Sequence, residues 1–229
     1  MVIRIGFIVF PNIMQLDLTG PYEVLAQAPD AELHLVWKDT APLRASSGLM
    51  LQPTTRFADC PQLDIICVPG GGGMNALLTD AETLAFLRKQ AEKARYVTSV
   101  CTGALVLGAA GLLKGRRAAT HWMSMEFLPA FGAIPVEERV VVDGNVITGG
   151  GVTAGIDFGL RVVAEIAGEE TARAIQLGIE YDPHPPFDSG HPRCASPTLL
   201  ETVTTKATAR QQARRKQVEA AAAALATRG

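Results

Sequence analysis

Short apolar runs alternate with longer segments of helical periodicity along most of the chain. Residues 31–37 predict one strand, and the β-branched and aromatic run at 96–100 predicts another. Residues 2–10 and 63–68 are richer in Ile, Val, Leu and Phe. Continuous apolar runs of this length are typical of parallel strands buried on both faces. Helices are predicted in between and afterwards, at 21–28, 79–94, 104–110, about 123–131, 154–167 and 169–178. The alternation predicts an α/β fold with one doubly wound, mostly parallel sheet flanked by helices.

Two hairpins and an extended arm complete the predicted elements. Residues 42–54 predict a small hairpin off the main sheet, with its turn at Ser46-Ser47-Gly48. Residues 138–142 and 145–148 predict a second hairpin, with Asp143-Gly144 between its strands. Pro-rich residues 182–187 predict an extended arm, and the alanine-rich stretch from 197 to 228 a long final helix on the surface or against a partner. We therefore expect one domain over residues 1–229, with the arm and last helix at about 182–229.

The segment from Arg95 to Gly108 changes period at Cys101-Thr102-Gly103, where a strand gives way to an apolar helix. A small-residue turn of this kind presents one side chain at the carboxyl edge of a sheet, facing the N–H groups of the helix. We expect Cys101 to be that side chain and its thiol to lose a proton easily, because a helix N-terminus stabilises a thiolate. From this segment alone, a buried cysteine that only packs is an equally good interpretation.

Two glycine-rich turns are expected at the same sheet edge. Residues 70–73 and 149–152 both follow predicted strands, and ligands of doubly wound folds bind beyond the carboxyl ends of the strands. Gly71, Gly72, Gly150 and Val152 are therefore candidate substrate-binding or oxyanion-stabilising residues. The first turn lacks the Gly-Lys-Ser/Thr of a phosphate-binding loop and the spacing of a dinucleotide fingerprint, and a simple tight turn remains a close alternative.

The acid or base that a thiol nucleophile needs is not obviously a histidine. His34 lies in a predicted strand, and His184 and His191 lie in the arm; His121 follows a strand and is a weak candidate. Asp17 is a better candidate for the acid or base than any of the histidines, since it follows the first strand in a segment that must return over the sheet edge. A helix-capping role for Asp17 explains its position equally well. Thr102 is expected to hydrogen-bond within the site, to cap the helix, or both.

Composition excludes several classes of protein. Charged residues make up 19% of the 229 residues and the net charge is −2, so nothing favours nucleic acid or an anionic membrane surface as a partner. The start resembles no signal peptide and no apolar run could span a bilayer, so we expect a cytoplasmic protein. The four cysteines have neither zinc spacing nor a CxxC pair, and we expect reduced thiols.

Four motifs together identify a resemblance to a known superfamily. The chain resembles the ThiJ/PfpI superfamily, relatives of class I glutamine amidotransferases with a flavodoxin-like fold and a cysteine on a nucleophile elbow. The motifs are QLDLTGP at 15–21, VPGG at 68–71, SVCTG at 99–103 and ITGGG at 147–151. Further similarity at 45–49, 57–61, 95–113, 120–122, 132–136 and 153–158 extends the resemblance over almost the whole chain, and within the superfamily it favours the isocyanide hydratases.

The resemblance implies a reaction and a role for each site residue. Cys101 would attack the terminal carbon of an isocyanide to give a thioimidate, and Asp17 would move protons and activate water, releasing an N-substituted formamide. Thr102 would hydrogen-bond within the site. The resemblance also implies a homodimer that needs no metal or organic cofactor.

Departures from other branches of the superfamily narrow the function. Protease-like and amidotransferase-like members place a histidine directly after the cysteine or elsewhere in a triad, whereas Thr102 follows Cys101 here. Glyoxalase-like members usually carry Glu at the position of Asp17, and the regulators continue into a helix-turn-helix region, so we expect no DNA binding. A redox- or ligand-sensing protein and a glyoxalase-like enzyme on the same cysteine remain the alternatives.

Overall fold

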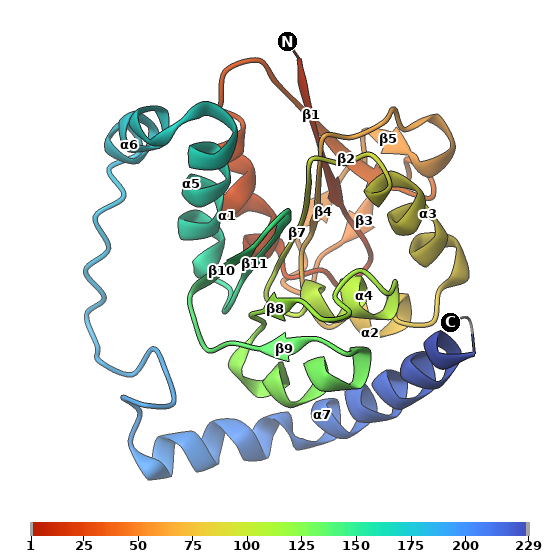
Figure 1. Cartoon of the computed structure of the whole chain (residues 1–229). Helices are drawn as coiled ribbons and strands as arrows, with labels where there is room; N and C mark the ends of the chain where they lie inside the picture. Colours follow the sequence, from red (N-terminus) through yellow and green to blue (C-terminus); the bar gives the residue numbers. More distant parts are fainter. Residues whose placement is uncertain (1, 228–229) are drawn as a thin grey trace.

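A seven-stranded sheet forms the centre of the computed structural model, which describes residues 2–227 (Figure 1). Its strands are β1 (Ile3–Ile8), β2 (Ala31–Trp37), β5 (Thr55–Arg56), β6 (Ile65–Val68), β7 (Tyr96–Val100), β10 (Val140–Asp143) and β11 (Val146–Gly149). They lie in the order β10-β11-β7-β6-β1-β2-β5, and every neighbouring pair is parallel except β10 with β11. The five principal parallel strands thus follow the 2-1-3-4-5 order of flavodoxin-like folds, with the switch point between β1 and β6.

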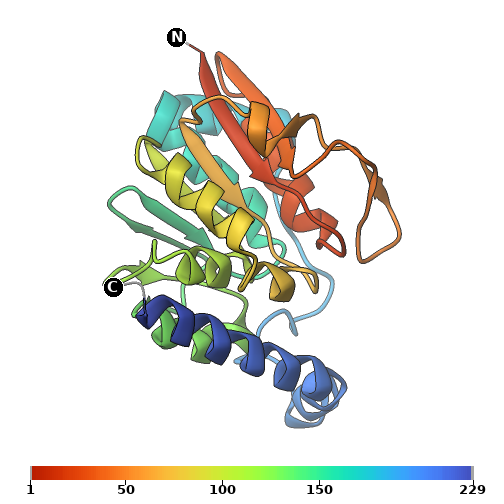
Figure 2. The ribbon, with the colours of Figure 1, turned by 90° about the vertical axis from the view of Figure 1, so that its right-hand side faces the viewer.

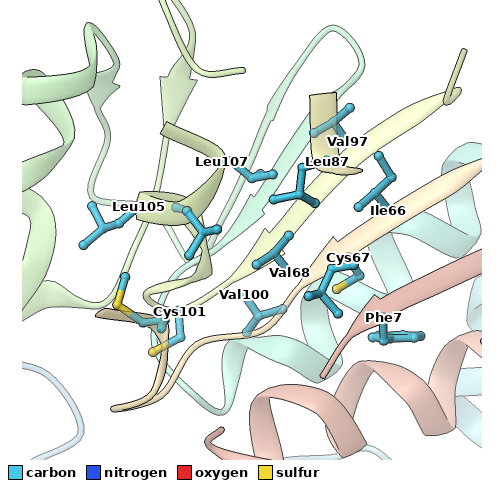
Figure 3. Packing of buried hydrophobic residues seen from close by; sticks show 14 of the residues in the cluster. Phe7, Ile66, Cys67, Val68, Leu87, Val97, Val100, Cys101, Leu105 and Leu107 are labelled. Carbon is cyan, nitrogen blue, oxygen red and sulfur yellow. The ribbon is translucent and has the colours of Figure 1, made fainter. Parts of the chain in front are cut away.

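Helices cover both faces of this sheet, as predicted. One face carries α1 (Gln15–Leu25), α5 (Ala154–Ala167) and α6 (Glu169–Gly178), and the other carries α2 (Met74–Leu77), α3 (Ala81–Ala91) and α4 (Gly103–Ala109) (Figure 1). The central strands β6 and β7 are therefore enclosed between helix layers, which explains why β6 is apolar throughout; β7 also buries two polar residues, Thr98 and Ser99. Figure 3 shows Cys101 beside Val100 at one side of this core, with Phe7 at the other.

Helix α1 begins earlier than the sequence predicts. We expected a helix over 21–28 with Pro21 in its first turn, but α1 starts at Gln15 and Pro21 lies inside it. A proline inside the helix is tolerated because α1 packs closely on α5: a Cβ added at Gly155 would lie 2.9 Å from Cδ of Pro21. Packing outweighs the hydrogen bond that a proline cannot donate. The earlier start places Asp17 on the first turn of the helix.

The smaller elements agree with prediction in kind and differ in detail. The hairpin at 42–54 is formed by β3 (Leu43–Arg44) and β4 (Met50–Leu51). The β10–β11 hairpin is present, but Asp143 pairs with Val146, so its turn lies one residue later than predicted. The helix expected at 123–131 is a 3₁₀ helix, η2 (Trp122–Phe131), which has Pro129 inside it. The remaining elements are η1 (Phe57–Asp59), β8 (Arg117–Ala118) and β9 (Ile134–Pro135).

The final helix α7 (Pro197–Ala226) follows an exposed arm without regular structure and crosses the end of the molecule (Figures 1 and 2). It packs on α2, α4 and η2. Ala207, Arg214, Val218 and Ala221 form its buried stripe, so its surface location is confirmed only in part. None of the helices in the described range is long and apolar enough to cross a membrane. The ends of the predicted domain, at residue 1 and at 228–229, lie outside the described residues.

Candidate active site

The turn at Cys101 has the strained geometry of a nucleophile elbow. Cys101 has a φ of 55°, a left-handed conformation that is uncommon for a residue with a Cβ. Its N–H donates to the carbonyl of Gly149 at 3.0 Å, and its carbonyl accepts from the hydroxyl of Thr120 at 2.8 Å. A Cβ at Gly103 would lie 1.9 Å from the carbonyl oxygen of Val68, so α4 can begin this close to β6 only with glycine there. Neighbouring segments therefore fix the position of the thiol.

Asp17 reaches the same point from α1. Its side chain is fully buried, and Oδ2 accepts a hydrogen bond from the N–H of Gly70 at 3.0 Å. Oδ1 accepts none from the described residues, and the Cys101 thiol lies close enough to the carboxyl for each group to shift the pKa of the other. Burial raises the pKa of Asp17 to about 7, against the opposing effects of Cys101 and Gly70. Both the acid and the carboxylate are therefore populated near neutral pH.

The expectation of an easily ionised thiol is wrong for this structure. Burial raises the pKa of Cys101 well above 9.0, and the nearby Asp17 charge raises it further. The N–H of Thr102 and the charge of Arg214 act in the opposite direction without reversing the shift. Cys101 and Asp17 are best described as one buried pair that retains a proton at neutral pH.

Thr102 joins the elbow to the first glycine-rich turn. Its hydroxyl is buried and accepts a hydrogen bond from the N–H of Gly71 at 3.1 Å, so the expected hydrogen bond within the site is present. A Cβ at Gly70 would lie 2.6 Å from both N and Oγ1 of Thr102 and 2.7 Å from Oδ2 of Asp17. Only glycine at this position lets the three segments approach each other so closely.

The other four candidate binding residues lie around this centre in different environments. The N–H groups of Gly71 and Gly150 already donate to protein acceptors, the hydroxyl of Thr102 and the carbonyl of Arg139. Gly72 is exposed with open space around it, and Val152 is half-buried just before α5. Their roles toward a substrate stay predictions.

His121 does not offer a base to Cys101. Its Nδ1 accepts a hydrogen bond from the N–H of Met123 at 3.3 Å, and its ring stacks on Trp122. Burial, together with the charges of Arg214 and Arg210, lowers the pKa of His121 to about 4. The ring is therefore a weak base, and its Nδ1 already has a hydrogen-bond partner. Within residues 2–227, no group of His, Cys, Asp and Glu side chains is arranged to hold a metal ion.

Sequence reasoning missed Arg214, whose side chain on α7 is only 4% exposed. It donates from Nε to Oδ1 of Asn75 at 3.1 Å and from Nη1 to Oγ of Ser124 at 2.7 Å. Its charge acts on both Cys101 and His121. The sequence does contain a pattern that indicates a buried arginine. Along the last helix, one arginine lies among small apolar residues at heptad-like spacing: Ala207, Arg214, Val218 and Ala221.

The family follows from a direct match. Residues 3–165, which include the elbow and Asp17, match the model of the DJ-1/PfpI family. The chain belongs to the DJ-1/PfpI family. Among curated relatives of this DJ-1/PfpI protein, an isonitrile hydratase of Pseudomonas putida is 56% identical over 225 residues, covering 98% of this chain and 99% of that protein.

Other relatives in the DJ-1/PfpI family are more distant or differ in length. A crystal structure of a ThiJ/PfpI family protein from Pseudomonas syringae superposes with a TM-score of 0.92 at 42% identity, covering 97% of this chain and 91% of that one. The HTH-type transcriptional regulator GbdR of Pseudomonas aeruginosa is 32% identical over 78% of this chain, which corresponds to 50% of the regulator. DJ-1β of Drosophila melanogaster shares the fold, with a TM-score of 0.71 at 24% identity over 79% of this chain and 98% of that one.

The raised pKa of Asp17 predicts that Asp17→Asn stabilises the folded protein at neutral pH. The folded-state pKa of about 7 lies above the ordinary value of 3.8, so the wild type should lose stability as pH rises from about 4 to about 7. The full loss is up to about 4 kcal/mol, from about 1.4 kcal/mol for each pKa unit. Denaturant unfolding of both proteins at several pH values should give equal stability near pH 4 and a more stable variant at pH 7. Parallel curves for the two proteins would show that the pKa of Asp17 is not raised.

Proposed function

We propose that this protein is an isocyanide hydratase, which adds water to an isocyanide to give an N-substituted formamide. The observation that supports this most directly is the buried pair formed by the Cys101 thiol on the elbow and the Asp17 carboxyl on α1. Support comes from the isonitrile hydratase that is 56% identical to this chain over nearly the full length of both proteins. An isocyanide carbon is a soft electrophile that suits sulfur, and its adduct needs a proton from a nearby acid.

In the first step the Asp17 carboxylate accepts the thiol proton while the Cys101 sulfur attacks the isocyanide carbon. The S–H bond breaks, an S–C bond forms, and negative charge develops on the attacked carbon. Asp17, now protonated, delivers that proton to the carbon and leaves a thioimidate on Cys101. Oδ1 of Asp17 is the oxygen suited to this transfer, because it accepts no hydrogen bond from the described residues, whereas Oδ2 accepts one from the N–H of Gly70. Asp17 ends the step as a carboxylate again.

In the second step Asp17 accepts a proton from water, and the resulting hydroxide attacks the thioimidate carbon. The nitrogen of the tetrahedral adduct takes up that proton. Asp17 then removes the hydroxyl proton, the C–S bond breaks, the formamide leaves and the proton returns to the thiolate. A pKa of about 7 suits a group that both accepts and donates protons near neutral pH. In this cycle Thr102 keeps the first glycine-rich turn, and with it Gly70, in place against the pair.

The geometry supports the alternatives less well. A peroxide sensor needs an exposed thiol with a low pKa, whereas Cys101 is 5% exposed and burial raises its pKa. A hydrolase triad needs a histidine that takes up a proton from the nucleophile near neutral pH, whereas the pKa of His121 is lowered to about 4 and its Nδ1 already accepts the N–H of Met123. We further propose that the chain acts as one domain in a cytoplasmic homodimer, with no nucleic-acid partner.

The test is turnover of an isocyanide by the purified wild-type protein. With cyclohexyl isocyanide or an aryl isocyanide as substrate, we expect formation of the matching N-substituted formamide, quantified by liquid chromatography and mass spectrometry. The rate should be proportional to enzyme concentration and unaffected by a metal chelator. Absence of formamide from a panel of alkyl and aryl isocyanides, with folded protein present, would overturn the proposal. A parallel reaction with methylglyoxal as substrate tests the glyoxalase-like alternative, which requires that methylglyoxal be consumed.

A further inference from the structure

Arg214 is a charged side chain enclosed by the protein. It is 4% exposed and belongs to the buried stripe of α7, where the helix crosses η2 (Figure 2). A guanidinium stays protonated at any pH at which this protein is expected to fold. Burying such a charge is costly unless something compensates it, so its presence in a stripe of small apolar residues needs an explanation.

All the hydrogen-bond partners that the structure gives Arg214 are neutral. They are Oδ1 of Asn75, Oγ of Ser124 and, at 3.5 Å, Oε1 of Gln211. No carboxylate among residues 2–227 lies within ion-pair distance of it. The next residue, Arg215, differs: it is exposed and pairs with Glu126 at 2.7 Å. The positive charge of Arg214 is therefore oriented by hydrogen bonds but not neutralised by them.

The residues that orient Arg214 belong to elements around Cys101. Asn75 lies on α2, directly after the glycine-rich turn at 70–73, and Ser124 lies on η2, shortly after Thr120, whose hydroxyl binds the Cys101 carbonyl. Helix α4, which begins two residues after Cys101, also packs on α7. The Arg214 charge lowers the pKa of Cys101, while burial and Asp17 raise it. The charged groups that act on the thiol are thus Asp17 and Arg214, with Arg210 acting on Arg214 from the same helix.

We propose that Arg214 is a positioning residue that acts through Cys101: its fixed positive charge stabilises the negative charge on the sulfur when Asp17 takes the thiol proton. This rests on the proposed function for its catalytic consequence. Asn75 and Ser124 keep the guanidinium in place, and α7 is thereby a part of the active site. A neutral side chain of similar volume would fill the space but would leave the thiolate without a positive charge nearby.

The test compares Arg214→Met, Arg214→Lys and Arg215→Met in the full-length protein. Alkylation of Cys101 by iodoacetamide, followed against pH by peptide mass spectrometry, measures its ionisation without any enzyme assay. We expect Arg214→Met to move the alkylation midpoint upward by about one pH unit and to lower kcat/KM at pH 7 about tenfold, as one pKa unit implies. Arg214→Lys should recover most of both effects because it keeps the charge. Arg215→Met removes an exposed ion pair on the same helix and should change neither.

An unchanged alkylation profile in folded Arg214→Met would overturn the inference, as would equal changes in the Met and Lys variants, which indicate packing alone. If Arg214→Met does not fold, the milder Ser124→Ala variant removes one anchor and should shift the same midpoint upward, by less; no shift there counts against the inference. A shifted midpoint in a protein without hydratase activity would uphold the electrostatic role and reject only the proposed function. Normal hydratase activity with an unchanged alkylation midpoint would reject the proposed role of Arg214 and leave the proposed function in place.

Discussion

Cys101→Ala is expected to lower the rate of formamide production at least about 10³-fold, because the S–C bond of the thioimidate can no longer form. The rest of the site should stay in place: Asp17 keeps its hydrogen bond from Gly70, and Thr102 keeps the one from Gly71. The measurement is kcat/KM for an isocyanide, with thermal unfolding as a check on folding. Intact-mass spectrometry of the wild type during turnover should detect an adduct equal to the mass of one isocyanide, which the variant should lack.

Two further variants separate the loss of the nucleophile from damage to the fold. Cys101→Gly removes the thiol and also relieves the φ of 55°, which glycine adopts without strain, so it should be inactive but well folded. Cys194→Ala removes an exposed thiol in the arm and should keep full activity. Activity within tenfold of wild type in either Cys101 variant would mean that another group attacks the substrate.

Much of the fold could be predicted because burial leaves a direct pattern in the sequence. Helices α5 and α6 have the predicted bounds, since an amphipathic period is visible in a short window. Strand β2 also has the predicted bounds, although only Val36 and Trp37 in it are buried. The start of α1 was wrong because a local rule, proline in the first turn, lost to close packing between Pro21 and Gly155, which lie far apart in the sequence. No short window of residues contains that contact.

The candidate site shows the same division between local and distant causes. The strand–turn–helix pattern was enough to place Cys101 at an elbow, because the change of period is local. The pKa of its thiol was not predictable: a helix N-terminus favours the thiolate, but burial and Asp17 outweigh it, and both depend on tertiary structure. Arg214 lies 139 residues from its partner Asn75, so its place near the elbow depends on the docking of α7.

Asp17→Asn is expected to lower kcat/KM about 10²- to 10⁴-fold, the range typical of a lost general acid–base group. Asparagine can still accept the hydrogen bond from Gly70, but it can neither take the thiol proton nor return one to the isocyanide carbon. Because this transfer already belongs to the first step, we expect no covalent adduct on Cys101 when the variant is mixed with an isocyanide. The matched control is Asp157→Asn, which changes a carboxylate paired with Arg139 on the surface of α5 and should leave turnover unchanged.

The pH dependence of the wild type tests the same role of Asp17 without a mutation. Asp17 must be a carboxylate to accept the thiol proton, and burial raises its pKa to about 7. Below that pH Asp17 is protonated and cannot accept the proton of the Cys101 thiol. We therefore expect kcat/KM to fall about tenfold for each pH unit toward acid and to level off above pH 7. In Asp17→Asn the remaining activity should lack this acidic limb. An acidic limb that survives unchanged in the variant would assign the titration to another group and remove Asp17 from the proton path.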